Sequence, residues 1–418
     1  MLQSSDYINK FQKNQDKTSL LVIYGTGTVG RLTLEALKEK NIKANYFCDD
    51  NSTKWNTTIE NIKVISPNEL YKFNNNIDIF ITGYQLSAIV PLLENRGFRN
   101  LYLSSNLLTD TLCKKNYKGK WSNDFLKHNW DGNEVKLMRI IEYYKKMGMK
   151  EDYIRNGVLD LKSIDIQVTE RCSLKCKDCN NLMQYYKKPQ DSEIGVLFKS
   201  IDKFMQCIDS LDEFRVLGGD PFMMKELYKV INKLVTYEKC KRVVVYTNAK
   251  IVPKGENLSC LKNKKVLLDI TNYGEISTAH SKVIELAKKE NIAFSTYRCT
   301  TWQDSGRIIP YSGKNEKELE KQFNNCCQRD LISLLYGKLY RCPYSANGVN
   351  LKAIPQNDSD EVNLINDNLS VNDLREQIKK LCYDKKYLTA CSYCNGKEAS
   401  TLKIPSAIQT KKPLNFLC

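Results

Sequence analysis

The chain contains very little histidine. Only His128 and His280 occur among its 418 residues. Histidine is the side chain whose unperturbed pKa lies closest to neutral pH, so it is a frequent proton carrier in enzymes. The chain therefore has few histidines available for acid–base catalysis, and we expect both of them to be surface or packing residues.

Long apolar runs are also missing. No run approaches the roughly 18 residues that a membrane-spanning helix needs. The first twenty residues, "MLQSSDYINKFQKNQDKTSL", lack the apolar segment of a signal peptide. We therefore predict a cytoplasmic protein without a membrane span. Thiols stay reduced in that compartment, so the 16 cysteines favour metal binding or catalysis over disulfides.

Acidic residues are outnumbered by basic ones, 48 to 64, which gives a formal net charge of +16. Such a surplus is compatible with a nucleic-acid partner or an anionic substrate. The lysines are nevertheless scattered along the chain, and no basic run resembles an RNA-binding arm. We interpret them as solvated surface residues and do not expect nucleic acid as a partner.

The hydrophobic pattern predicts an α/β protein with several parts. Apolar strands alternate with helical stretches over residues 17–115, which predicts a small Rossmann-like parallel sheet with helices on both faces. A lysine-rich helical connector follows at 116–160. Residues 161–322 alternate again and predict a partial (β/α)6 barrel, in which five strands are clear and a sixth is not. Residues 323–400 change to short strands around cysteines and predict a small separate domain.

Three cysteines lie within the stretch "CSLKCKDC", at positions 172, 176 and 179. They directly follow the first barrel strand, at the end where such folds keep their chemistry. A structural zinc site needs four ligands and usually offers paired C-x2-C elements, so a fourth thiol is missing here. Three thiolates on an iron–sulfur cluster leave one iron open for a substrate or cofactor. The spacing therefore favours a cluster.

The same stretch resembles the CxxxCxxC signature of radical S-adenosylmethionine enzymes. The resemblance covers about 160–400 and implies a [4Fe–4S] cluster on Cys172, Cys176 and Cys179. In that family the open iron chelates S-adenosylmethionine. Reductive cleavage then yields a 5′-deoxyadenosyl radical, which abstracts hydrogen from the substrate. The resemblance also implies a reductant such as flavodoxin or ferredoxin.

Two further stretches resemble cofactor-binding motifs of that family. "LGGDPF" ends the second barrel strand and resembles the GGE motif, which holds the methionyl amino group; its residues are Gly218, Gly219 and Asp220. Aspartate in place of glutamate is one methylene shorter. "YTNAK" ends the third strand, and Thr247 and Asn248 stand where the family contacts the ribose and the methionine. Taken alone, "GGDP" reads as a turn.

The later cysteines resemble the "twitch" version of the SPASM extension, C-x9–15-G-x4-C followed by C-x2-C. The matching residues are Cys327, Gly337, Cys342, Cys391 and Cys394. This implies one auxiliary [4Fe–4S] cluster, and therefore two clusters per chain. A four-cysteine zinc ribbon uses the same thiols. The sequence does not choose between Cys326 and Cys327, and Cys382 is a spare or substitute ligand.

A glycine loop, "GTGTVG", follows the first strand of the N-terminal domain. Its glycines are Gly25, Gly27 and Gly30, and Asp49 lies about twenty residues further on. This context is typical of a dinucleotide fingerprint, in which a helix N-terminus holds phosphate. The domain also resembles small Rossmann-like domains of surface-sugar synthesis enzymes. We keep three options: NAD, a nucleotide-sugar, and an empty glycine turn in a docking domain.

"STYRCTTWQDSG" runs from the fifth strand into the loop above it, and its candidate substrate residues are Arg298, Cys299, Trp302 and Asp304. Arg298 is suited to a phosphate or hydroxyl group. Cys299 is either a buried apolar residue, which leaves oxidation as the reaction, or a hydrogen donor, which makes the enzyme an epimerase. We favour oxidation.

These expectations converge on a radical enzyme that oxidises or epimerises a sugar, cyclitol or nucleotide-sugar in glycan biosynthesis. Two alternatives remain open, namely a maturase acting on a peptide or protein and a non-enzymatic, zinc-stabilised binding protein. The sequence identifies neither the substrate nor the oligomeric state.

Overall fold

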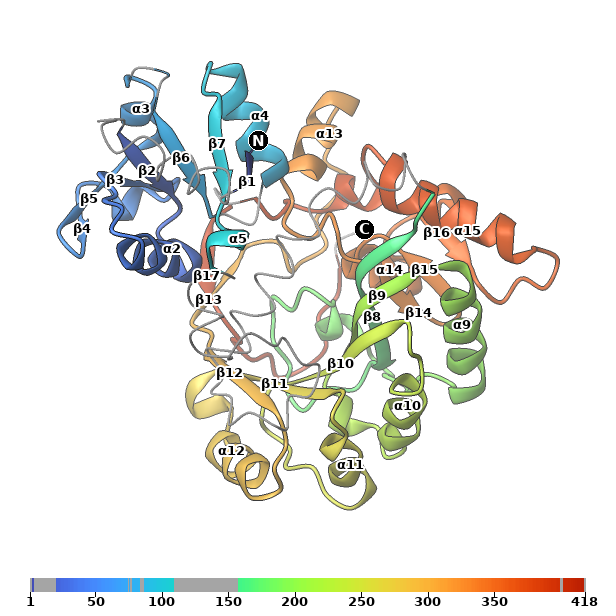
Figure 1. Ribbon diagram of the computed structural model, residues 1–418. Helices are drawn as coiled ribbons and strands as arrows, with labels where there is room; N and C mark the ends of the chain where they lie inside the picture. Colours follow the sequence, from blue (N-terminus) through green and yellow to red (C-terminus); the bar gives the residue numbers. More distant parts are fainter. Residues whose placement is uncertain are drawn as a thin grey trace. The chain divides into compact units, whose positions relative to one another are not determined.

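A computed structural model describes residues 2–3, 20–73, 75, 77–82, 86–108, 157–398 and 401–416. The described residues fall into two compact units, one up to residue 108 and one from residue 157 onward, and each is treated by itself (Figure 1). Apart from its last four residues, the predicted connector 116–160 lies outside the described residues.

In the first unit, the described strands form one sheet in the order β1-β7-β6-β2-β3-β5-β4. All neighbours pair in parallel except β4 and β5, which are antiparallel. The strands are β1 (Leu2–Gln3), β2 (Leu21–Tyr24), β3 (Tyr46–Cys48), β4 (Thr58–Ile59), β5 (Ile62–Ile65), β6 (Asp78–Ile81) and β7 (Asn100–Leu103).

The predicted parallel sheet is therefore confirmed, because strands were expected near β2, β3, β6 and β7. All four residues of β2 are buried, as expected for a central strand covered on both faces. The short strands β4 and β5 were not predicted. The helical elements of this unit are α2 (Thr28–Glu39), η1 (Ser52–Lys54), α3 (Pro67–Leu70), α4 (Leu86–Asn95) and α5 (Ser105–Leu108).

In the second unit, the described strands form a larger sheet in the order β12-β11-β10-β9-β8-β14-β15-β16, and a two-stranded sheet of β13 and β17. Neighbours from β12 to β14 pair in parallel. The strands are β8 (Asp160–Thr169), β9 (Ser210–Gly218), β10 (Cys240–Thr247), β11 (Val266–Asn272), β12 (Phe294–Arg298), β13 (Thr301–Gln303), β14 (Ser333–Leu335), β15 (Lys338–Tyr340), β16 (Glu361–Asn363) and β17 (Lys403–Pro405).

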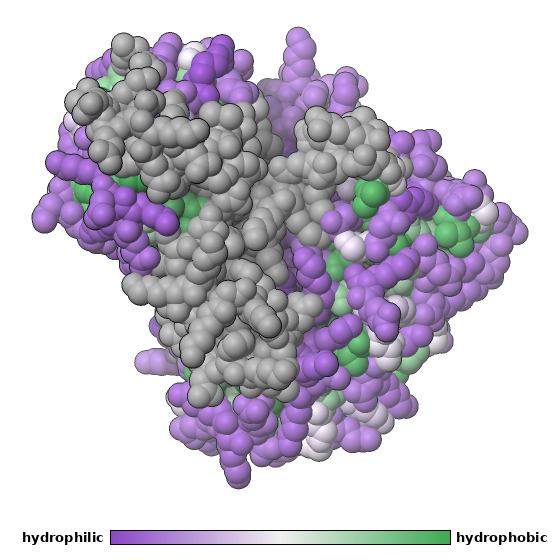
Figure 2. All heavy atoms as spheres, in the orientation of Figure 1, coloured by the Kyte–Doolittle hydropathy of each residue, from purple (hydrophilic) through white to green (hydrophobic). Residues whose placement is uncertain are grey.

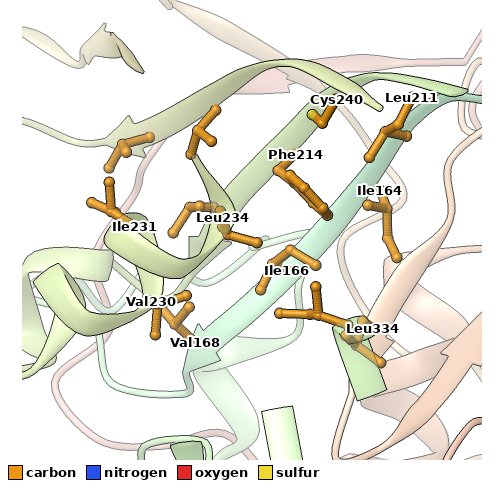
Figure 3. Packing of buried hydrophobic residues seen from close by; sticks show 14 of the residues in the cluster. Ile164, Ile166, Val168, Leu211, Phe214, Val230, Ile231, Leu234, Cys240 and Leu334 are labelled. Carbon is orange, nitrogen blue, oxygen red and sulfur yellow. The ribbon is translucent and has the colours of Figure 1, made fainter. Parts of the chain in front are cut away.

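Helices connect the parallel strands and cover one face of this sheet. Figure 3 shows Ile164, Ile166 and Phe214 of β8 and β9 in the same hydrophobic cluster as Ile231 and Leu234 of α10. The helical elements are η4 (Met183–Tyr185), α9 (Ile194–Cys207), η5 (Pro221–Met223), α10 (Leu227–Leu234), α11 (Glu256–Ser259), η6 (Cys260–Lys262), η7 (Gly274–Ile276), α12 (His280–Lys289), α13 (Glu316–Asn325), α14 (Pro343–Asn350), η8 (Asp358–Asp360), α15 (Val371–Lys379), η9 (Lys380–Asp384) and η10 (Thr389–Tyr393).

The barrel prediction holds for its five clear strands, which match β8 to β12. A sixth strand of this series is not found within residues 157–398, so the six-unit count is not confirmed. Instead, β14 continues the sheet beside β8. The cysteine-rich segment thus shares the barrel's sheet, and the boundary expected at 322 does not separate two compact units.

The surface seen in Figure 2 is largely hydrophilic where it is coloured, with hydrophobic residues in small, separate patches. Scattered apolar surface residues are normal in folded proteins. Among the described residues, no helix has both the length and the apolar character needed to cross a membrane. Localisation stays a prediction.

Candidate functional site

The loop after β8 gathers the three cysteines of the "CSLKCKDC" stretch. Cys176 packs with Leu174 and Ala407 in one apolar cluster, and Cys172 and Cys179 lie against the same cluster. Three side chains that are distant in sequence also pack against it; they are Tyr273, Ile276 and Trp302. The three thiols therefore share one apolar cluster at the carboxyl end of β8, while their role as ligands stays a prediction.

Each of these sulfurs has N–H donors directed at it. The backbone N–H of Leu174 lies 3.4 Å from Cys172 Sγ, and Asn248 Nδ2 lies 3.6 Å from the same sulfur. Gln409 Nε2 lies 3.2 Å from Cys176 Sγ. Backbone N–H groups of residues 181–183 donate hydrogen bonds to the sulfur of Cys179. Such donors stabilise sulfur that carries negative charge, as a ligating thiolate does.

Without a metal, the protein strongly favours the protonated thiols. Burial raises the pKa of Cys176 to about 12. Burial also raises the pKa of Cys172, with the charge of Asp220 as the next cause. A bound metal reverses this preference, because a coordinating thiol is deprotonated.

Two glycines at the end of β9 pack directly against the backbone of the cysteine loop. A Cβ on Gly219 would lie 2.1 Å from the carbonyl oxygen of Arg171 and 2.8 Å from Cys172 Cβ. A Cβ on Gly218 would lie 2.1 Å from the Thr169 carbonyl oxygen. Both glycines are thus needed for the close approach of β9 to the loop. The sequence had predicted close approach to a ligand instead.

Asp220 is buried and links the ends of two strands. Its Oδ2 accepts hydrogen bonds from Thr247 Oγ1 at 2.9 Å and from the Asn248 N–H at 3.0 Å. Its Oδ1 accepts from the Phe222 N–H at 3.1 Å. Burial raises the pKa of this carboxyl, against the effect of these donors. The expected role toward an ammonium group stays a prediction, while its contacts to β10 are a function that the sequence did not reveal.

Asn248 joins this network to the cysteine loop. Its Nδ2 donates to Ser173 Oγ at 3.2 Å, in addition to its contact with Cys172 Sγ. Ser277 Oγ donates to the Asn248 carbonyl oxygen at 2.8 Å. Asp220, Thr247 and Asn248, which were predicted at the ends of β9 and β10, therefore form a network that reaches the cysteine loop. Ser173 and Ser277 also belong to this network and were not predicted from the sequence.

The donor set suits an iron–sulfur cluster. Among the described residues, no three His, Cys, Asp or Glu side chains converge closely enough to hold a single metal ion. Thiolates that bind different irons of one cluster do not have to converge in that way. Thiolate is the soft ligand that iron–sulfur clusters use. Three thiols in an apolar, N–H-lined loop therefore fit such a group.

A second group of cysteines lines one cavity in the C-terminal segment. Its four cysteines are Cys326, Cys342, Cys391 and Cys394. Burial raises the pKa of Cys391 to about 12 and that of Cys394 to about 11. Gln322 Nε2 donates to the carbonyl oxygens of Cys391 and Cys394 at 3.0 and 3.2 Å. Four thiols from three separate segments thus face one space.

Cys326 and Cys327, between which the sequence does not choose, lie differently with respect to this cavity. Cys326 lines the cavity, whereas Cys327 is exposed and its Sγ lies 3.7 Å from Gln303 Oε1 outside it. The cause is the end of α13 at Asn325, where Cys326 takes an extended conformation. Successive side chains on an extended backbone point in opposite directions. Cys382 is buried in the main hydrophobic core and does not line the cavity.

Gly337, the glycine of the predicted twitch motif, is explained by the turn in which it lies. Tyr336 and Gly337 connect β14 and β15 with φ angles of 46° and 84°. Both angles are positive, as in the tight hairpin turns in which glycine is favoured. The hairpin brings Cys342, just beyond β15, back to the cavity.

The predicted substrate residues run from the end of β12, where Arg298 lies, through β13, which contains Trp302 and is followed by Asp304. Arg298 is exposed, and its Nη1 donates to Asn272 Oδ1 at 3.1 Å. The ring of Trp302 packs edge-on against Tyr273, with centroids 5.6 Å apart, beside the cysteine loop. The Asp304 N–H donates to the Leu402 carbonyl oxygen at 2.8 Å, which ties this residue to the C-terminal tail.

Cys299 lies near the same cluster. Burial raises the pKa of its thiol, and hydrogen bonds from Trp302 and Ser406 oppose that rise. It is half-buried, so it is neither a core residue nor a freely exposed thiol. Its predicted role stays open.

In the first unit, Gly25 and Gly27 lie in the turn between β2 and α2, and Gly30 lies in the first turn of α2. Gly25 has φ 112°, and a Cβ on Gly30 would lie 1.9 Å from the Gly25 carbonyl oxygen. A Cβ on Gly27 would meet nothing within 4 Å. Two glycines therefore serve the turn itself, and Gly27 faces open space.

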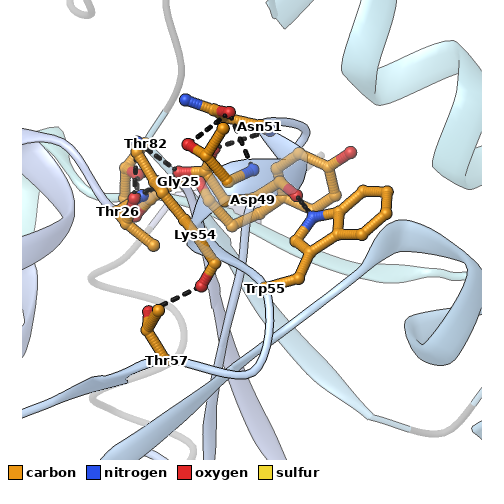
Figure 4. A network of polar contacts seen from close by, with 10 residues as sticks. Gly25, Thr26, Asp49, Asn51, Lys54, Trp55, Thr57 and Thr82 are labelled. Atoms are coloured by element: carbon orange, nitrogen blue, oxygen red, sulfur yellow. Dashed lines mark hydrogen bonds and ion pairs between the residues drawn. The ribbon is translucent and has the colours of Figure 1, made fainter.

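Asp49 makes its hydrogen bonds within the protein (Figure 4). Its Oδ2 accepts from the Thr26 N–H at 2.9 Å and from Lys54 Nζ at 3.0 Å, and the Thr26 hydroxyl donates to the same oxygen. Its Oδ1 accepts from the Asn51 N–H at 2.9 Å. The carboxylate that the dinucleotide option assigned to a ribose is thus engaged by the glycine loop and Lys54.

Comparisons with known proteins match separate parts of the chain. Residues 17–88 match the family model described as C2185-like, N-terminal. Two curated relatives are both named GTP 3′,8-cyclase. The protein from Campylobacter lari is 28% identical over 89 residues, which cover 21% of this chain and 27% of its own. The protein from a Sulfurovum species is 21% identical over 191 residues, which cover 44% of this chain and 54% of its own.

Among solved structures, BtrN in complex with AdoMet and 2-DOIA is 16% identical, with a TM-score of 0.36, and covers 62% of this chain and 98% of its own. The anSMEcpe structure with bound AdoMet and Cp18Cys peptide is 15% identical, with a TM-score of 0.37, and covers 58% and 92%. At these scores the two structures carry no argument about function. The chain spans about half or less of the curated relatives it matches.

Proposed function

We propose that the protein is a radical S-adenosylmethionine enzyme whose first [4Fe–4S] cluster is held by Cys172, Cys176 and Cys179. The observation that carries this proposal is the gathering of three thiols in one N–H-lined loop after β8, against which the ends of β9 and β10 are packed. Two relatives named GTP 3′,8-cyclase support an enzymatic role.

When bound, the cluster and S-adenosylmethionine supply an electron and a 5′-deoxyadenosyl radical for hydrogen abstraction. The chain's own residues hold the site in place. Asp220 fixes Thr247 and the backbone of Asn248, and Asn248 in turn contacts Ser173 and Cys172. The apolar side chains around the loop, including Trp302, restrict access of water to the sulfurs.

We extend the proposal to a second cluster on Cys326, Cys342, Cys391 and Cys394. Its support is the single cavity that these four side chains line. A zinc ion is the competing occupant, but it would require these thiols to move closer together, because among the described residues no three such side chains converge on a single ion. Flavodoxin or ferredoxin remains our proposal for the reductant.

For the substrate, we propose a sugar, cyclitol or nucleotide-sugar. The face of the β8–β12 sheet opposite the helices supports a polar substrate. Arg215 on this face pairs with Asp165 at 3.1 Å, and its Nε donates to Tyr246 OH at 3.2 Å. Thr271 Oγ1 donates to Tyr297 OH at 3.1 Å. The relatives' name supports a nucleotide, so GTP belongs among the compounds to be tested.

The test begins with anaerobic reconstitution and counts of iron, sulfide and zinc. About eight irons per chain are expected for two clusters, and zinc without iron would contradict the enzyme. Release of 5′-deoxyadenosine is then measured with nucleotide-sugars, free cyclitols, GTP and peptides. Product formation with a peptide alone would replace the sugar proposal by peptide maturation.

The reaction outcome is tested at Cys299. We propose oxidation, for which a cluster held by Cys326, Cys342, Cys391 and Cys394 would supply an electron acceptor. Cys299→Ala should then leave turnover to the oxidised product unchanged. If product is lost while 5′-deoxyadenosine is still released, Cys299 is the hydrogen donor of an epimerase.

A further inference from the structure

The C-terminal tail lies along the loop that carries the first three cysteines. Lys177 N–H donates to the Ile408 carbonyl oxygen at 2.8 Å, and Thr410 N–H donates to the Lys175 carbonyl oxygen at 2.7 Å. Cys176 and Gln409 face each other as an antiparallel pair. A segment more than two hundred residues away in sequence is thus paired with the middle cysteine.

Further contacts hold the tail on both sides of this pair. Ala407 is fully buried in the apolar cluster of the loop. Ser406 Oγ donates to the Cys299 carbonyl oxygen at 2.8 Å, and Leu414 N–H donates to the Gln184 carbonyl oxygen at 2.8 Å. The position of Gln409 beside Cys176 is therefore fixed by several independent contacts.

The orientation of the Gln409 amide follows from its partners. Its Oε1 accepts a hydrogen bond from the Lys175 N–H at 2.8 Å, which only an oxygen can do. Its Nε2 donates to the Ala407 carbonyl oxygen at 2.7 Å, which only a nitrogen can do. The nitrogen, with its second hydrogen, is thus the atom that lies 3.2 Å from Cys176 Sγ.

We infer that Gln409 is a positioning residue of the first cluster, donating a hydrogen bond to the Cys176 thiolate and thereby raising the reduction potential of that cluster. The inference rests on the proposed function. Reduction adds negative charge to a cluster and its sulfur ligands, and hydrogen bonds to those sulfurs set its potential. Asn248, from the barrel, and Gln409, from the tail, are side-chain donors at these sulfurs.

Gln409 is exposed, so its replacement is compatible with folding. Two variants separate the donor from the tail contact. Gln409→Glu keeps an oxygen for the Lys175 N–H but places a carboxylate beside the sulfur. Gln409→Leu removes all three hydrogen bonds of this side chain at similar size. Gln356→Leu, at another exposed glutamine that bonds Glu361, is the matched control.

The experiment is an anaerobic redox titration of the reconstituted full chain, followed by electron paramagnetic resonance, with iron counted in each sample. Replacement of Cys326 and Cys342 by Ala in every sample removes the second cluster from the signal. We expect the midpoint potential to fall in Gln409→Leu, to fall further in Gln409→Glu, and to stay unchanged in Gln356→Leu.

An unchanged potential in both Gln409 variants with normal iron content would overturn the inference and leave the proposed function intact. Loss of the cluster in Gln409→Leu, with Gln409→Glu retaining it at an unchanged potential, would also overturn it. If the parent protein binds no cluster through Cys172, Cys176 and Cys179, the proposed function itself fails.

Discussion

Asn180 Nδ2 donates a hydrogen bond of 3.0 Å to Gln328 Oε1. Asn180 directly follows Cys179, and both side chains line the cavity of the second cysteine group. The same Gln328 oxygen lies 3.8 Å from Cys342 Sγ. Lys397 also lines that cavity, and its charge acts to lower the pKa of Cys179 against the effect of burial. The two cysteine groups are therefore neighbours within one unit.

Their proximity has a consequence for replacing the first group. Replacement of Cys172, Cys176 and Cys179 by Ala should remove about four irons per chain and abolish 5′-deoxyadenosine release. The second group should keep its own irons, because its four cysteines are unchanged. Iron and sulfide assays and chromatography of the adenosine product check this. Cys299→Ala is the control, since it belongs to neither group. Continued 5′-deoxyadenosine release by the triple variant would contradict the assignment.

The second group allows a test with two adjacent residues. Cys326→Ser should lose the second cluster, because this thiol lines the cavity, whereas Cys327→Ser should retain it. The two changes are chemically identical and one position apart, so general destabilisation does not account for a difference. Mössbauer spectra and iron counts of both variants give the answer. Retention of the full iron content by Cys326→Ser would return Cys327 to the ligand set.

The contact of Gly219 with the cysteine loop predicts a local effect of one methyl group. In Gly219→Ala the new Cβ would lie 2.1 Å from the Arg171 carbonyl oxygen, so the loop has to shift. Overpacking of this kind costs about 1–3 kcal/mol. We expect lower thermal stability and poorer incorporation of the first cluster. Gly27→Ala, where a Cβ meets nothing within 4 Å, should change neither.

Much of the barrel followed from the sequence, because apolar strands such as β8 and β10 alternate with helical stretches at regular intervals. The short pair β4 and β5 was missed, since β4 has two residues and too little pattern to recognise. The same limit applies to the end of α13. A shift of one residue in that helix end decides whether Cys326 or Cys327 faces the cavity.

The C-terminal tail shows why some contacts could not be predicted from the sequence. Gln409 lies in "SAIQT", which carries no motif, and its importance comes from pairing with Cys176 across the fold. Asp49 shows the reverse case. Its place after β3 fits the dinucleotide pattern, yet Lys54 from an unpredicted 3-10 turn engages its carboxylate. A local sequence pattern identifies which chemical groups are present, whereas the fold determines which partners those groups bind.

Asp49 leads to a prediction about pH. Burial alone acts to raise the pKa of this carboxyl, but hydrogen bonds from Thr26, Asn51 and Lys54 outweigh it and hold the pKa below its ordinary value. A carboxyl with a lowered pKa in the folded state stabilises the fold above its unfolded pKa of about 3.9, and this stabilisation is lost as the pH falls through the folded pKa. Asp49→Asn should therefore destabilise the N-terminal unit at neutral pH, by about 1–3 kcal/mol.

The difference between Asp49→Asn and the parent protein should shrink as the pH is lowered toward the folded pKa of Asp49. Urea unfolding of 5-fluorotryptophan-labelled protein measures this locally, because Trp55 Nε1 donates to the Asp49 carbonyl oxygen at 2.6 Å. Asp50→Asn is the adjacent control. Burial and the charge of Asp49 raise the pKa of Asp50, so its replacement should not destabilise the unit at neutral pH more than at acid pH. A pH-independent difference for Asp49→Asn would show that its carboxylate charge does not stabilise the glycine loop.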